Sequence, residues 1–143
     1  MAAGMAFHDV HGQVLLVEPS YIQANREIPG GAVEADESPW ATASRELAEE
    51  LGWQRPLGRL LVVDYVRQQD SGPEGVYWLD GGVLDETDLM GLSFRDAEIV
   101  SVALCTRRGA REGEDAVGGP SQVALEAAEH GLTVLCEHRR RIG

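Results

Sequence analysis

The chain has 143 residues, 43% of them hydrophobic and 25% charged, which is enough to bury the core of one globular domain. Its net charge of −12 creates a negative field that repels nucleic acid duplexes and anionic membranes, so neither is expected as a partner of the whole surface. The sequence has no basic leader followed by an apolar run, and no stretch approaches the roughly 18 apolar residues of a membrane-spanning helix. We therefore expect a cytoplasmic protein with a single domain, residues 1–143.

The N-terminal part predicts a β-hairpin. Two short apolar runs, residues 2–7 and 13–17, are separated by a polar turn that contains glycine. The next segment, residues 18–31, contains two prolines and ends in a pair of glycines, so irregular backbone is expected there.

A helix is predicted over residues 39–51. Ser38 is a suitable N-cap, Pro39 fits the first helical position, and Gly52 stands where helices commonly end. Helical periodicity places four residues on one core-facing stripe: Trp40, Ala43, Leu47 and Leu51.

The remainder of the chain predicts further strands and one more helix. Residues 58–69 and 76–84 are rich in strand-forming residues and flank a turn, so they are expected to pair as antiparallel strands. Beyond them we expect a strand at 97–105, a mobile loop at 106–120, a helix at 121–131 and a terminal strand at 132–138. Strands on both sides of an amphipathic helix indicate a compact α/β sandwich.

The first helix carries an unusual concentration of carboxylates. Glu46, Glu49 and Glu50 lie on one flank of it, beside the apolar stripe. Like charges at these spacings repel each other, and the single guanidinium of Arg45 cannot balance all three. A hard divalent cation such as Mg²⁺ would neutralise them, since it prefers carboxylate oxygens and substrate phosphates as ligands. A merely solvated acidic face is the alternative that the spacing alone leaves open.

The wider pattern around this helix resembles the signature of the Nudix hydrolases. The matching positions are Gly31, Glu37, Arg45, Glu46, Leu47, Glu49, Glu50 and Gly52, followed by the bulky Trp53. Trp53 is the mildest departure, because an aliphatic residue is more usual there. The resemblance covers roughly residues 2–105.

The resemblance implies a fold, a reaction and a cofactor. The implied fold is an α/β/α sandwich with a mixed, partly antiparallel sheet, in which the signature forms a loop–helix–loop. The implied reaction is hydrolysis of a diphosphate bond in a nucleoside diphosphate linked to another group, with Mg²⁺ or Mn²⁺ as cofactor. The implied partner is a nucleotide-type small molecule, and a homodimer is compatible with it.

The resemblance also implies residue roles. Glu46, Glu49 and Glu50 match the metal-binding carboxylates, and Gly30 matches a ligand that binds through its backbone carbonyl. Arg45 matches the arginine that orients these glutamates, and Glu37 matches the partner of that arginine. The general base stays open: Glu49 or Glu50 could serve, and so could Asp96 or Glu98 from a later loop.

The substrate is not assigned by the sequence. The extra motifs of the hydrolases of ADP-ribose, dinucleoside polyphosphates, NADH and coenzyme A are absent, which leaves a general MutT-like interpretation. Aromatic stacking and anion contacts could come from Tyr21, Arg26, Tyr65, Arg67 and Trp78. The alternative for each of these is an ordinary core aromatic or surface charge.

Two other functions remain open at this stage. One is a non-catalytic Nudix-fold sensor that binds a nucleotide without hydrolysing it. The other is a metal-dependent isomerase of an isoprenoid diphosphate, against which the absence of a cysteine near the glycines argues. The basic run 139–141 is expected to be a solvated C-terminal segment.

Overall fold

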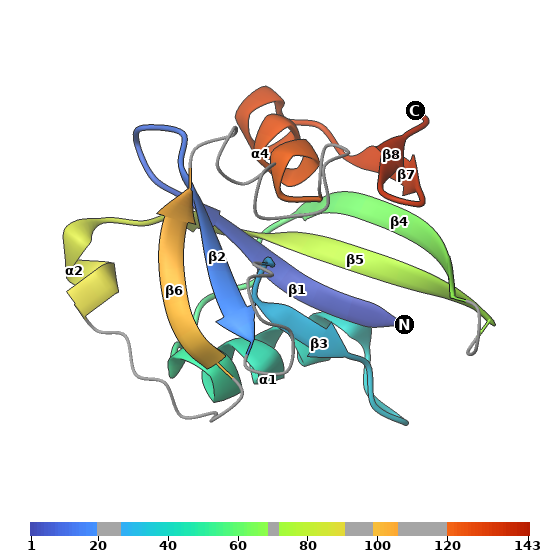
Figure 1. Ribbon diagram of the computed structural model, residues 1–143, viewed down its shortest axis with the longest axis horizontal. Helices are drawn as coiled ribbons and strands as arrows, with labels where there is room; N and C mark the ends of the chain where they lie inside the picture. Colours follow the sequence, from blue (N-terminus) through green and yellow to red (C-terminus); the bar gives the residue numbers. More distant parts are fainter. Residues whose placement is uncertain (20–26, 69–71, 91–98, 106–119) are drawn as a thin grey trace.

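The computed structural model of the chain describes residues 1–19, 27–68, 72–90, 99–105 and 120–143. Within these ranges a mixed sheet forms the middle layer, with α1 on one face and α4 on the other (Figure 1). The strands are β1 (Ala2–His8), β2 (Val14–Pro19), β3 (Gly30–Ala32), β4 (Leu60–Gln68), β5 (Gly72–Val83), β6 (Ile99–Cys105), β7 (Val134–Glu137) and β8 (Arg140–Arg141). The helices are α1 (Pro39–Leu51), α2 (Glu86–Met90) and α4 (Pro120–His130). The predicted α/β sandwich is confirmed.

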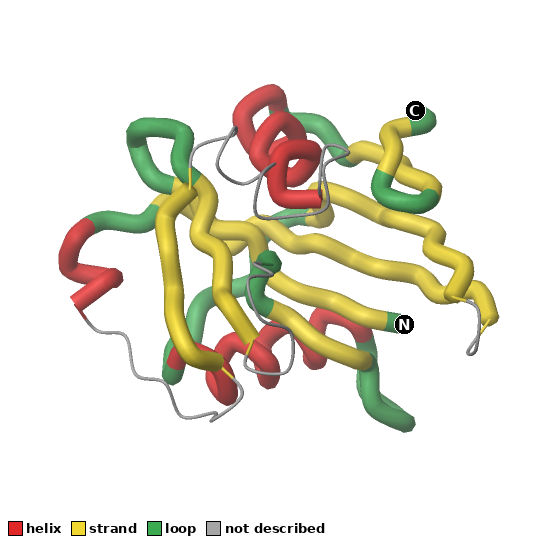
Figure 2. The backbone as a smooth tube through the Cα atoms, in the orientation of Figure 1, coloured by secondary structure: helices red, strands yellow, loops and turns green. Residues whose placement is uncertain are grey.

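The sheet brings together strands that lie far apart in the sequence. Its order is β6-β2-β1-β5-β4-β7-β8, and β3 pairs with β1. β1 runs parallel to β5 and β4 runs parallel to β7, whereas the other neighbours are antiparallel. Figure 2 shows the strands in yellow between helices in red. The expected hairpin is the pair β1–β2, and the expected antiparallel pair of the middle segment is β4–β5. Strand β5 occupies one edge of β1. Strands β2 and β3 therefore share the other edge of β1.

The core lies on both faces of the sheet, because successive side chains of a strand point to opposite faces. Along β2, Leu15 and Val17 pack on the side of α1, and Val14 and Leu16 pack on the side of α4. The α1 side contains Ala3, Met5, Phe7, Leu15, Val17, Ala43, Leu47, Leu51, Trp53, Leu79 and Leu84. The α4 side contains Ala6, Val14, Leu16, Ile28, Leu61, Val62, Ala124, Leu125, Ala127, Val134 and Cys136.

Helix α1 begins and ends as its sequence predicts. The Ser38 hydroxyl accepts a hydrogen bond from the N–H of Ala41 at 3.1 Å, and Gly52 adopts a left-handed φ of 69°. The predicted apolar stripe is right except at its start, since Trp40 is 55% exposed. The buried residue of the first turn is Thr42.

Three further differences from the sequence predictions concern local structure. Gly30 and Gly31, expected to be irregular, lie in β3, and the short elements α2 and β8 were not predicted. Strand β5 begins at Gly72, inside the predicted turn. Most of the predicted loop at 106–120 lies outside the described residues. No helix in the described ranges is long and apolar enough to cross a membrane.

Candidate metal and catalytic site

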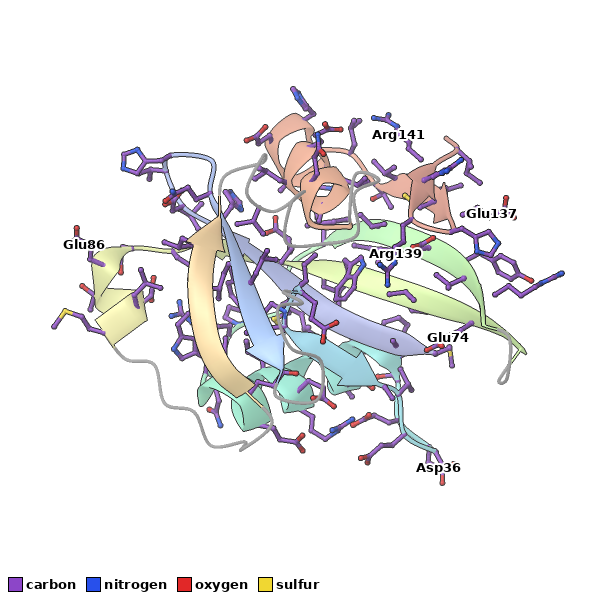
Figure 3. The ribbon with its side chains drawn as sticks, in the orientation of Figure 1. Asp36, Glu74, Glu86, Glu137, Arg139 and Arg141 are labelled. Carbon is purple, nitrogen blue, oxygen red and sulfur yellow. The ribbon has the colours of Figure 1, made fainter. Side chains whose placement is uncertain are left out.

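The glutamates of α1 are positioned by the apolar residues between them. Ala43, Leu47 and Leu51 are almost fully buried against the sheet, which fixes the rotation of the helix. The loop from β3 to α1 turns through Asp36, whose φ is 65° and whose side chain points away from the molecule (Figure 3). The signature therefore forms a loop, the helix α1 and a second loop, as the resemblance implied, and its first residues lie in β3.

Arg45 is the centre of the charged network. Its Nε and Nη2 donate to the two carboxylate oxygens of Glu37, at 2.8 and 3.0 Å. Its Nη1 donates to Glu46 Oε1 at 3.0 Å and to Glu49 Oε2 at 3.2 Å. Nη2 also donates to the backbone carbonyl of Ala32, at 3.1 Å. The guanidinium of Arg45 thus connects the end of β3, the loop before α1 and two turns of α1.

Glu37 holds Arg45 in place. The Thr42 hydroxyl donates to Glu37 Oε1 at 2.5 Å, and the backbone N–H of Glu34 donates to the same oxygen at 3.3 Å. The hydrogen bond from Arg45 is the main reason that the pKa of Glu37 falls to about 2, and the bond from Thr42 adds to it. The ion pair raises the pKa of Arg45 above its already high value. Both groups are therefore charged across the physiological range.

Glu50 lies in a different environment, inside the protein. The residue is 5% exposed, and its Oε2 has no hydrogen-bond partner within the described part of the chain. Burial is the main cause that raises the pKa of Glu50 to about 9, and the nearby Glu46 carboxyl adds to the rise. Glu50 also forms a hydrogen bond with Glu46 and accepts one from the backbone of Gly30, and the charge of Glu27 raises its pKa further. Burial likewise raises the pKa of Glu46, against the opposing effect of Arg45.

The two glycines of β3 allow these groups to approach the backbone. A Cβ on Gly31 would lie 2.4 Å from Oε1 of Glu46, and one on Gly30 would lie 2.4 Å from the carbonyl oxygen of Ala3. At Gly31 the missing side chain leaves room for a carboxylate, whereas at Gly30 it allows the pairing with β1.

The carboxylates of α1 supply the oxygen donors that a hard cation prefers, but they are not arranged as a complete set of metal ligands. Among the described residues, no three His, Cys, Asp or Glu side chains converge as metal ligands. Arg45 accounts for this, because it binds Glu46 and Glu49 itself. The residues nevertheless fit a divalent cation. Buried Glu50 has an oxygen that no described residue bonds, Glu46 lies beside it, and the donor atoms are all oxygen, as Mg²⁺ prefers.

The residues predicted to line a substrate pocket are scattered. Tyr65 is 40% exposed on β4 with its ring edge against His138, and Arg67 is exposed two residues further on. Trp78 is half-buried on β5, packed against the core on the α4 side. The structure does not bring Trp78 together with Tyr65, since these two residues point to opposite faces of the sheet. Tyr21, Arg26, Asp96 and Glu98 lie outside the described residues.

Sequence reasoning missed Thr42 and Gly4. Thr42 has a weak signal, a polar residue in the first turn beside the cap, but nothing in the sequence shows that its hydroxyl reaches Glu37. Gly4 lies where a Cβ would be 2.2 Å from the Pro29 carbonyl oxygen and 2.4 Å from the Trp78 ring. This close approach depends on pairing between distant segments, so no local pattern reveals it.

Known proteins resemble this chain in sequence and in fold. Residues 1–119 match the family model of the NUDIX domain. A MutT protein from Methanosarcina mazei Go1 superposes with a TM-score of 0.70 at 16% identity, covering 91% of this chain and 93% of that one. An Ap4A hydrolase from C. elegans, solved as a binary complex, superposes with a TM-score of 0.66 at 16% identity, covering 91% and 97%.

A shorter match is closer in sequence. It joins 51 residues of the chain, at 47% identity, to Diphosphoinositol polyphosphate phosphohydrolase 2 of Rattus norvegicus. The match spans 36% of this chain and 28% of the length of that protein. The family model covers most of the chain, and the solved structures have the same mixed sheet between helices. The chain therefore belongs to the Nudix hydrolase family.

Proposed function

We propose that the protein hydrolyses a diphosphate bond in a nucleotide-type substrate with the help of a divalent cation. The observation that carries the proposal is the buried carboxyl of Glu50, held beside Glu46 and the backbone of Gly30. One of its oxygens has no hydrogen-bond partner among the residues that the structure describes. A buried carboxyl without full hydrogen bonding is costly, and such groups concentrate at functional sites. Nudix hydrolases generally use divalent metals such as Mg²⁺.

Glu46, Glu49, Glu50 and the backbone carbonyl of Gly30 would hold the cation. When bound, it supplies positive charge that polarises the phosphoryl oxygens and lowers the pKa of water. Arg45 donates hydrogen bonds to Glu46 and Glu49, so it would orient these carboxylates for the cation, and Glu37 holds Arg45 itself in place.

A side chain of the protein must also accept the proton that the attacking water releases. In the reaction a water oxygen forms a bond to one phosphorus, the P–O bond of the anhydride breaks, and the other phosphate leaves with the electron pair. A carboxylate accepts the proton of the attacking water. Glu49 suits this role by its exposure, since its side chain is 49% exposed, and Glu50 is the alternative. Asp96 and Glu98 remain further candidates.

The substrate class rests on the relatives. The similar solved structures include a MutT protein and an Ap4A hydrolase, and the short match is to a diphosphoinositol polyphosphate phosphohydrolase. We take a nucleotide-linked diphosphate as the first class to test and a diphosphorylated inositol phosphate as the second. Both contain the anhydride bond that the proposed site would cleave.

A substrate panel tests the proposal. The protein is incubated with nucleoside triphosphates, dinucleoside polyphosphates, ADP-ribose, sugar nucleotides and a diphosphoinositol polyphosphate, with Mg²⁺, with Mn²⁺ and with chelator. We expect metal-dependent turnover of at least one compound. Glu49→Gln and Glu50→Gln should each lower its rate by about 100-fold or more, because general-base catalysis alone contributes that much. Glu86→Gln, on the distant α2, is the matched control and should keep the rate.

The panel also decides between hydrolysis and sensing. Absence of turnover with every compound and both metals would overturn the proposed hydrolysis. Binding of a nucleotide at micromolar concentration without product would instead support the sensor interpretation.

A further inference from the structure

The turn between β7 and β8 is anchored to the sheet by a buried carboxylate. Its two central residues, His138 and Arg139, both have left-handed φ angles, 50° and 66°, as the tightest hairpins require. The N–H of His138 donates to the carbonyl of Tyr65 at 2.9 Å. The N–H of Arg139 donates to both carboxylate oxygens of Asp64, at 3.2 and 3.1 Å, and Asp64 is 2% exposed. The turn is therefore anchored to β4, and residues 139–141 are exposed, as expected of a solvated C-terminal segment.

This anchoring places Arg139 on a particular face of the sheet. Asp64 is opposite Val76 of β5, and two residues further along Val62 is opposite Trp78, so these side chains share a face. Trp78 is on the α4 side, and its ring lies against Gly4. Figure 3 shows the Arg139 side chain over β4 and β5, whereas Arg141 points away from the sheet. The effect of the Arg139 charge on the pKa of Asp64 agrees with this position.

The same row of the sheet leads to the proposed metal site. Gly30 of β3 is opposite Gly4 of β1, which pairs with Trp78 of β5, which in turn pairs with Val62 of β4. Gly30 also contacts the Glu50 carboxyl. Three strand spacings of about 4.8 Å, roughly 14 Å in all, separate Gly30 from Val62. The turn lies beyond Val62, where it is bonded to Asp64 two residues further along β4.

The charge of Arg139 makes it suited to bind an anionic group. Its side chain is exposed, and no carboxylate of the described ranges forms an ion pair with it. The chain carries a net charge of −12, so an exposed guanidinium above the sheet contrasts with the field around it. A guanidinium presents donors only, in a planar fork that matches phosphate.

We propose that Arg139 binds a phosphate group of the substrate that lies beyond the bond to be cleaved. The inference rests on the proposed function, because it places the cleaved diphosphate at the glutamates of α1. It makes Arg139 a specificity-determining residue: substrates with a second anionic group bind more tightly than those without one. Arg139 lies beyond residues 1–119, the part of the chain that matches the family model.

Two pairs of compounds test this inference by binding, without need of turnover. ADP-ribose is compared with its 2′-phosphate, and coenzyme A with its form lacking the ribose phosphate. Calorimetric titrations are done in chelator with the wild-type protein, Arg139→Gln, Arg139→Lys and Arg140→Gln. Arg140 is the matched control, because it is exposed on β8 beside the turn and has the same charge. The backbone N–H that binds Asp64 is kept in every variant, and thermal unfolding verifies the fold.

We expect the wild-type protein to bind the phosphorylated member of at least one pair about 10-fold or more tightly, the range of a charge-assisted hydrogen bond. Arg139→Gln should abolish this preference, Arg139→Lys should keep part of it, and Arg140→Gln should retain it. Equal affinity within both pairs would overturn the inference, and so would an equal loss in Arg139→Gln and Arg140→Gln. Failure of the proposed hydrolysis is a separate result, because it is read from turnover in the substrate panel.

Discussion

At the scale of single residues, the site is a balance between one guanidinium and several carboxylates. Arg45 pairs with four carboxylates, and one positive charge cannot neutralise them: Glu34, Glu37, Glu46 and Glu49. The excess negative charge is relieved by the raised pKa values of Glu46 and Glu50. In the absence of metal, a proton on Glu50 thus neutralises negative charge that a bound cation would otherwise neutralise.

The two glycines of β3 should respond differently to alanine. In Gly31→Ala the added Cβ meets the end of the flexible Glu46 side chain, which can move, so stability should change little. Metal affinity should fall by about 10–100-fold, because the carboxylate is displaced. In Gly30→Ala the Cβ meets the backbone of Ala3 and Gly4, so we expect about 1–3 kcal/mol of destabilisation. Thermal unfolding and metal titration separate the two effects. Equal destabilisation by both variants would contradict this explanation.

Thr42 should act on the site through Glu37. Thr42→Val keeps the shape of the buried side chain but removes the hydroxyl that donates to Glu37 Oε1. Glu37 then loses a bond that lowers its pKa and orients it toward Arg45. We expect kcat to fall by about 10-fold, in the range of losses seen when a supporting hydrogen bond of a metal site is removed. Thr42→Ser retains the hydroxyl and should restore the rate. A serine variant as slow as the valine variant would rule out this role.

At the scale of elements, α1 combines two patterns that the helix geometry keeps apart. Its apolar residues face the sheet, its carboxylates line the adjoining flank, and both depend on the rotation that the core packing sets. The helix has no acidic residue in its first turn and no basic residue in its last, so favourable charges at its ends do not stabilise it. Helix α1 is therefore stabilised by its packing against the core and by its two caps.

Two substitutions on α1 test which residues supply that packing. Leu47→Ala removes a side chain that is 1% exposed and should lower the free energy of unfolding by about 2–5 kcal/mol. Trp40→Ala removes a larger side chain that is 55% exposed and should have an effect within about 0.5 kcal/mol. Chemical denaturation of both variants provides the comparison. A large loss in Trp40→Ala would show that the tryptophan packs against the protein in solution.

At the scale of the whole molecule, stability depends on pH through the buried site. The folded-state pKa of Glu50 is raised to about 9 from 4.5, so between these values the folded protein holds a proton that the unfolded chain has released. Its contribution to stability is complete below pH 4.5 and is lost as the pH rises through 9. Glu37 has the opposite sign, but its lowered pKa acts only below pH 4.5.

We therefore expect the metal-free protein to lose stability between pH 5 and pH 9, by at most about 1.4 kcal/mol per pH unit for one proton. Glu50→Gln should flatten this dependence and make the metal-free protein more stable at the alkaline end. Denaturation curves across this pH range measure it, with Glu86→Gln as the control that keeps the wild-type slope. A slope unchanged in Glu50→Gln would mean that another group carries the proton.

The sequence by itself determined the features that depend on neighbours along the chain. The caps of α1, its apolar residues from Ala43 onward, and the hairpin β1–β2 follow from local patterns of a few residues. The spacing of the carboxylates was also readable, because an α-helix repeats every 3.6 residues and places them on one flank. These patterns were sufficient to identify the family, and the comparisons confirmed it.

Only the tertiary structure decided what depends on distant segments. The parallel pairs β1–β5 and β4–β7 join strands with long connections between them, so no local signal sets their register. The burial that raises the pKa of Glu50 comes from the close approach of α1 and β3, which the helix pattern alone does not contain. Arg139 is the clearest case: a terminal run of arginines looks solvated in the sequence, and only the buried Asp64 on a distant strand fixes one of them above the sheet.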